Sequence, residues 1–242
     1  MKTNYASLLA VAVLLIDTCA SAIDTHTSTV LFVPFPVFVP VPVEQVAHST
    51  PNTQVTPQVP LQKQNPQQPD FNTYDVNGLK PIHKACMAGD AAAVAFFIAH
   101  GASVEELCEY EGKTPLYYAS QYNRPDVVKL LLEEYKANPD AQANKSAYFR
   151  TPLHTAALKG HTEVAALLLK HKADIEARTA AFRTPLHCAT EFDRVDTLKL
   201  LLESNANPCA QDDSHNTPIA FARNSPAALL ISGVLIRSIT QN

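Results

Sequence analysis

The sequence predicts an all-α solenoid in which about five helix–turn–helix repeats follow a Pro-rich N-terminal arm. A Thr-Pro-Leu motif, more worn in its first and last copies, recurs with prolines 34, 37, 33 and 33 residues apart: Pro81, Pro115, Pro152, Pro185 and Pro218. A period of about 33 residues fits one turn and two helices. Thr is a good N-cap and Pro is tolerated at the first helical position, so each motif predicts the start of a helix.

The central repeat shows both helices of the unit. A short apolar helix follows Thr151 and ends near Gly160. A second helix then carries Val164, Leu167 and Leu168 at helical spacing. One such pair cannot bury its apolar face alone, whereas about three or more stacked pairs form a continuous core.

This unit resembles the ankyrin repeat family, and the resemblance covers residues 71–242, with repeats that start near residues 78, 112, 149, 182 and 215. It implies short β-hairpin loops and a non-enzymatic protein–protein interaction module or scaffold. It also implies a structural role for the motif residues: Pro81, His83, Thr114, Pro115, Thr151, Pro152, His154, Thr184, Pro185, His187, Thr217 and Pro218. The recurring His could instead suggest a metal ligand or proton relay, but its periodic placement favours the structural role.

The N-terminus is predicted to be a cleavable secretory signal over residues 1–22. Lys2 precedes the apolar residues 8–16, and Ala22 ends a small-residue cleavage site. A membrane anchor needs about 20 apolar residues, and Asp17 ends this run too early. A lipoprotein modified at Cys19 is the weaker alternative. We therefore expect a secreted or periplasmic protein that begins at Ile23.

A Pro/Gln-rich arm is expected over residues 23–70. Residues 30–43 are all apolar or Pro, and their prolines forbid a helix. This segment either marks a docking site or folds back onto the repeats, and membrane contact is expected only through it. Residues 44–70 are rich in Gln, Pro, Thr and Asn, which predicts a disordered linker.

Three features depart from a regular array. The second repeat carries one extra residue in 133–136 and three in the loop 141–149, and such insertions fall in loops. The fifth repeat lacks the His and ends in the apolar residues 227–236, although a terminal cap should have a polar outer face. This apolar end indicates incomplete shielding or a contact with another segment or chain.

Four cysteines remain if the signal is removed: Cys86, Cys108, Cys188 and Cys209. Bridges between the first and fourth repeats are excluded because stacked layers separate those pairs too far. Bridges within one repeat stay open, although Cys86 occupies a packed helical position that favours a buried free thiol. No Cys/His spacing predicts a metal site.

The chemistry excludes several functions. A net charge of −4 does not favour nucleic acid. No GxSxG, glycine-rich phosphate loop or HExxH motif is present, so we expect no enzyme and no cofactor. We expect the chain to be a monomer that binds a protein partner. The alternative is a structural cell-envelope or surface protein tethered through residues 30–43.

The candidate partner surface lies at the loop tips. Where the family usually has Gly, this chain has Gly78 and Gly112 but then Phe149, Phe182 and His215. Bulky residues do not easily adopt positive φ, so these tips are expected to differ in backbone. The rings either pack on neighbouring tips or bind a partner.

Basic residues precede the motif threonines, and the exposed positions of the first helices are expected to add aromatic residues to the same side. Arg and aromatic residues are enriched at interface hot spots, although a charge row is often only a solvated face. The predicted partner-binding residues are Lys113, Tyr118, Tyr122, Tyr148, Phe149, Arg150, Phe182, Arg183 and Phe192.

Overall fold

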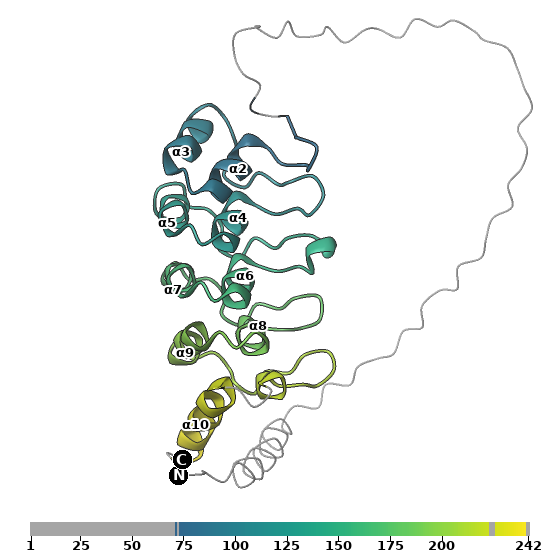
Figure 1. The fold of residues 1–242 in the computed structure, drawn as a ribbon, viewed down its shortest axis with the longest axis vertical. Coiled ribbons are helices and arrows are strands. Elements are labelled where there is room, and N and C mark those ends of the chain that lie inside the picture. The colour runs from purple at the N-terminus through teal and green to yellow at the C-terminus, as the bar shows by residue number, and fades with distance from the viewer. Residues whose placement is uncertain (1–70, 72, 223–225, 241–242) are drawn as a thin grey trace, which may run out of the picture. The chain divides into compact units, whose positions relative to one another are not determined.

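The computed structural model describes residues 71, 73–222 and 226–240. These residues form stacked helix pairs with loops that extend to one side (Figure 1). The predicted signal over residues 1–22 and the arm over residues 23–70, including residues 30–43, lie outside the described residues.

The helices stand in two columns (Figure 1). The inner column, next to the loops, consists of α2 (Pro81–Ala88), α4 (Pro115–Gln121), α6 (Pro152–Lys159), α8 (Pro185–Glu191) and the 3₁₀ helix η2 (Pro218–Phe221). The outer column consists of α3 (Ala91–Ala99), α5 (Pro125–Glu133), α7 (Thr162–Lys170), α9 (Val195–Glu203) and α10 (Pro226–Thr240). A second 3₁₀ helix, η1 (Lys145–Ala147), lies in the loop before α6.

The Thr-Pro motif starts the inner helices as expected. The Thr114 hydroxyl accepts a hydrogen bond from Tyr117 N at 3.2 Å, and Thr151 and Thr184 cap α6 and α8 in the same way. The first repeat has Lys80 at this position, without a side-chain cap bond, and the prolines still occupy the first helical turn.

The fifth repeat departs from the pattern because Thr217 makes no side-chain cap bond. Its inner helix is only the four-residue η2. The Thr-Pro motif therefore still starts a helix here, but this helix is a short 3₁₀ helix rather than an α-helix. In α10, Leu229 and Ile236 are exposed, as either alternative predicted for this end requires: incomplete shielding or a contact with another segment or chain.

The hydrophobic core runs the length of the stack and is built mainly from Leu and Ala side chains. Leu116, Leu153 and Leu186 of the inner helices are buried, as are Leu131, Leu168 and other outer-helix residues. Of the two leucines predicted for α7, Leu168 is completely buried and Leu167 is half-buried. Small residues such as Ala156 and Ala189, both fully buried, let the helices approach closely.

Side chains at the start of the outer helices connect each repeat to the preceding one. Arg124 Nε donates to Met87 O at 2.9 Å, and Arg194 Nε donates to Leu158 O at 3.1 Å. The Arg194 side chain lies over Gly160, where a Cβ would be 2.8 Å from its Cδ. Gly160 also has φ +81°, so both its backbone and the Arg above it require glycine.

Cys86, Cys108 and Cys188 are buried free thiols. Burial raises the pKa of Cys86 to about 12 and that of Cys188 to about 11. Since the thiolate is the reactive form, Cys86 and Cys188 are structural and unreactive.

Among the described residues, no helix has the length and apolarity needed to cross a membrane.

Candidate functional site

The loop tips form one braced edge of the stack. Each tip is a turn closed by a backbone hydrogen bond, such as Cys108 N to Lys113 O at 3.0 Å, and none of the described residues forms a β-strand. Successive tips are joined by backbone bonds from Glu109 N to Gly78 O (2.9 Å), Asn144 N to Glu111 O (2.9 Å), Ala180 N to Tyr148 O (2.9 Å) and Asp213 N to Ala181 O (3.2 Å). The edge is therefore a continuous surface rather than five separate loops.

The expected difference between glycine tips and bulky tips is wrong. Phe149, Phe182 and His215 have φ of +53°, +56° and +60°, close to +68° at Gly78 and +57° at Gly112. The left-handed conformation costs a non-Gly residue roughly 1–2 kcal/mol. At Phe182 the turn offsets this cost, because its N–H donates to Thr179 O at 2.9 Å and its carbonyl accepts from Arg178 Nη1 at 2.7 Å.

The recurring histidines join each inner helix to the next loop. His154 Nδ1 lies 2.9 Å from the Thr151 hydroxyl, and His154 Nε2 lies 3.0 Å from Arg183 O. His187 repeats this arrangement with Thr184 and, at 3.1 Å, Asn216 O. These bonds are those of a structural histidine.

Burial keeps these imidazoles neutral. It lowers the pKa of His154 to about 4, and it also lowers the pKa values of His83 and His187 below their ordinary value. A neutral ring matches the geometry, because Nδ1 accepts from the Thr151 N–H at 3.2 Å while Nε2–H can donate to a carbonyl.

The second repeat has Tyr117 where the first, third and fourth repeats have His. Its ring is buried and forms a cluster with Ala143 and Ala147 of the next loop. Ala147 belongs to the three-residue insertion, so the tyrosine fills space beneath the enlarged loop.

The structure places five predicted aromatic residues at the surface. Tyr148, Phe149 and Phe182 are 59%, 39% and 60% exposed at the tips. Tyr122 and Phe192, at the ends of α4 and α8, are 43% and 44% exposed. We call these five residues together with Tyr110 the aromatic surface.

Two predicted binding residues are internal. Tyr118 is only 5% exposed, so the expectation of an exposed position was wrong: its register is that of Thr155 and Cys188, which are also buried. Lys113 is 8% exposed because its ammonium pairs with Glu111 at 2.7 Å and lies over the Tyr117 ring at 5.1 Å.

The two arginines of the predicted basic row are half-buried and engaged within the chain. The Arg150 guanidinium stacks on the Tyr148 ring at 5.0 Å. Arg183 pairs with Glu191 at 2.9 Å and lies 3.7 Å from Asp212. Arg183 therefore braces the fourth and fifth repeats, and it is not a freely available anchor.

Sequence reasoning missed Tyr110, which is 58% exposed at the second tip. It compared only the glycine positions and the residues just before Thr, whereas Tyr110 lies two residues before Gly112. Its ring packs over the first tip, since a Cβ on Gly78 would lie 2.8 Å from a Tyr110 ring carbon.

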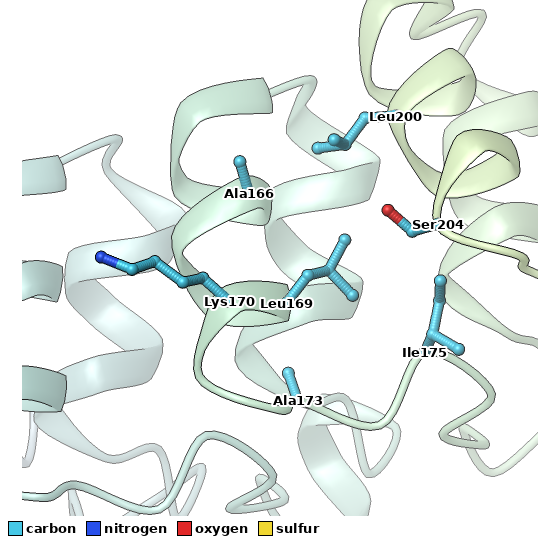
Figure 2. A pocket seen from close by; sticks show the side chains of 7 residues that line it. All are labelled: Ala166, Leu169, Lys170, Ala173, Ile175, Leu200 and Ser204. Atoms are coloured by element: carbon cyan, nitrogen blue, oxygen red, sulfur yellow. The ribbon is translucent and has the colours of Figure 1, made fainter.

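A shallow depression of about 470 Å³ lies between α7 and α9, on the side of the stack away from the loops (Figures 1 and 2). Its lining is mostly apolar: Ala166, Leu169, Lys170, Ala173, Ile175, Leu200 and Ser204. Lys170 extends away from the other six side chains (Figure 2). Together these residues do not supply the convergent polar groups that orient a small ligand in a binding pocket.

Within the described part of the chain, no three His, Cys, Asp or Glu side chains come close enough together to hold a metal ion.

A family model for ankyrin repeats (3 copies) matches residues 56–143 and 139–212. The chain is 33% identical over 107 residues to ankyrin repeat and SOCS box protein 11 of Pongo abelii, covering 44% of this chain and 31% of that protein. It is 35% identical over 97 residues to the nuclear factor NF-kappa-B p105 subunit of Mus musculus, covering 40% of this chain and 10% of that protein. It is 30% identical over 111 residues to alpha-latrocrustotoxin-Lt1a of Latrodectus tredecimguttatus, covering 46% of this chain and 8% of that protein. The chain thus spans less than a third of each of these proteins.

Proposed function

Because the chain belongs to the ankyrin repeat family, whose repeats generally bind protein partners, we propose that it is an exported, non-enzymatic binding module. It acts as a monomer and holds one protein partner on the aromatic surface defined above. The observation that carries this proposal is that four large rings stay exposed at tips that backbone hydrogen bonds already hold together: Tyr110, Tyr148, Phe149 and Phe182. Tyr122 and Phe192 add exposed rings at the ends of α4 and α8.

The energetics favour this surface over the basic row. Tyr and Phe side chains offer large contact area at a low cost in conformational entropy. The tips are held in register before binding, so little ordering is required when a partner docks. Arg183 pairs with Glu191 and Arg150 stacks on the Tyr148 ring, so we assign both to positioning the tips rather than to direct contact.

Export rests on the predicted signal over residues 1–22. Sequencing of the protein isolated from its source should find Ile23 at the N-terminus. Protein that retains Met1 or stays only in the cytosol would refute export and leave the binding proposal standing.

The binding test compares two changes in the full chain. Changing both Phe149 and Phe182 to Ala should weaken capture of a partner cross-linked in the exported fraction by about 1–2 kcal/mol, roughly five- to thirty-fold. The matched control is Phe96→Ala on α3, which removes an aromatic ring of 47% exposure from the outer column. Equal losses for both variants would refute the assignment of the surface.

The second candidate is a cell-envelope or surface protein tethered through residues 30–43, which the unbroken apolar and Pro composition of that segment favours. Deleting residues 30–43 should then release the protein from the envelope fraction. If the protein is equally soluble with and without them, tethering is refuted.

A further inference from the structure

We propose that Asn144 is an N-glycosylation site, and this proposal rests on the proposed export. Asn144-Lys145-Ser146 is the only Asn-x-Ser/Thr triplet, with x other than Pro, in the 242 residues. Such a triplet is the acceptor for N-linked oligosaccharide when it lies in a surface loop of a secreted protein.

The triplet is created by the loop insertion. Asn144 corresponds to Ala180 in the next repeat, since both donate their backbone N–H to the preceding tip. The extra residues form η1, Lys145–Ala147, and they supply the hydroxyl two positions after the asparagine. Asn144, Lys145 and Ser146 are all exposed.

The local geometry brings the acceptor amide and the hydroxyl together. Ser146 Oγ lies 2.5 Å from Asn144 Oδ1, and Ser146 N donates to the same oxygen at 3.1 Å. The two side chains that define the acceptor are therefore already adjacent in the folded loop.

The folded loop can keep its contacts after modification. Asn144 Nδ2 donates to Tyr110 O at 2.8 Å. A primary amide nitrogen carries two hydrogens, and attachment of a sugar replaces only one. The remaining N–H can still donate to the Tyr110 carbonyl, so a glycan does not require the second and third tips to separate.

The oligosaccharide is transferred to Asn144 from a donor in which it is carried on a polyprenyl diphosphate. The bond between sugar C1 and the phosphate oxygen breaks, and a bond from Asn144 Nδ2 to C1 forms. The amide nitrogen loses one proton, and the polyprenyl diphosphate leaves with the bonding electron pair. No oxidant or reductant is needed.

A glycan at Asn144 also has a consequence for partner binding. Asn144 lies against the backbone of the second tip, where a Cβ on Gly112 would be 3.2 Å from its Cβ. The oligosaccharide would therefore stand beside Tyr110 and leave partner contact to the other rings of the aromatic surface.

The test is translation of the full chain in the presence of microsomes that contain oligosaccharyltransferase. We expect a protease-protected product with the added mass of one oligosaccharide, which peptide N-glycosidase removes while converting Asn144 to aspartate. Ser146→Ala should abolish the shift, and Ser146→Thr, which keeps the hydroxyl, should retain it. Both variants keep Asn144 and its bond to Tyr110 O, and Ser146→Thr also keeps the hydroxyl that donates to Tyr110 O at 3.1 Å.

A second version of the chain has residues 1–22 replaced by a proven cleavable signal. It tests the glycosylation site independently of whether the natural signal directs export. A protected but unmodified product from this version overturns the glycosylation site. If it is modified while the natural chain stays outside the microsomes, the site is supported and export is refuted.

Discussion

Acidification between about pH 6.5 and pH 4 should destabilise the folded chain through its buried histidines. His83, His154 and His187 have folded-state pKa values below the ordinary 6.5, with burial as the main cause. As pH falls below 6.5, the unfolded state binds protons that the folded state does not. The free energy of unfolding therefore decreases over this window.

The magnitude follows from His154, whose pKa is lowered from 6.5 to about 4. At about 1.36 kcal/mol per pKa unit, this one residue removes about 3 kcal/mol of stability between those values. His83 and His187 act in the same direction. A domain with a typical stability of about 5–15 kcal/mol should then lose a large part of it before pH 4.

The measurement is denaturant unfolding at pH 7.5, 6.5, 5.5 and 4.5. His154→Gln keeps a side-chain N–H that can reach Arg183 O but does not titrate, so this variant should lose stability less steeply on acidification than the original chain. His215→Gln, which replaces an exposed ring, is the matched control, and its slope is the reference for His154→Gln. An unfolding free energy that stays flat from pH 6.5 to 4.5 would refute the role assigned to the buried rings.

Two further predictions use the same unfolding assay. Leu168→Ala, which truncates a completely buried side chain in α7, should cost about 2–5 kcal/mol, and a loss near zero would contradict the repeat register. Phe182→Gly should be as stable as the original chain or more stable by up to about 1 kcal/mol, because glycine accepts φ +56° without strain, whereas Phe182→Ala keeps that strain. If the glycine variant is much less stable than the alanine variant, the ring itself braces the neighbouring tips.

The sequence alone determined the helix starts and the ankyrin architecture. A Thr cap and a Pro act within one turn of helix, so their effect at Thr114, Thr151 and Thr184 does not depend on distant contacts. The period of about 33 residues then fixed which residues share a register. Tyr118 was predicted at an exposed position of the first helix, but it shares the register of Thr155 and Cys188, which are also buried.

Only the tertiary structure decided which tip residues are available and which backbone conformations they adopt. Phe149 and Phe182 take positive φ because hydrogen bonds within the turns and between neighbouring tips outweigh a local preference of roughly 1–2 kcal/mol. Arg183 is withheld from the surface by Glu191 and Asp212, and Asp212 lies in the next loop, 29 residues away along the chain. Contacts of this kind join separate repeats, so no local pattern in the amino-acid sequence specifies them.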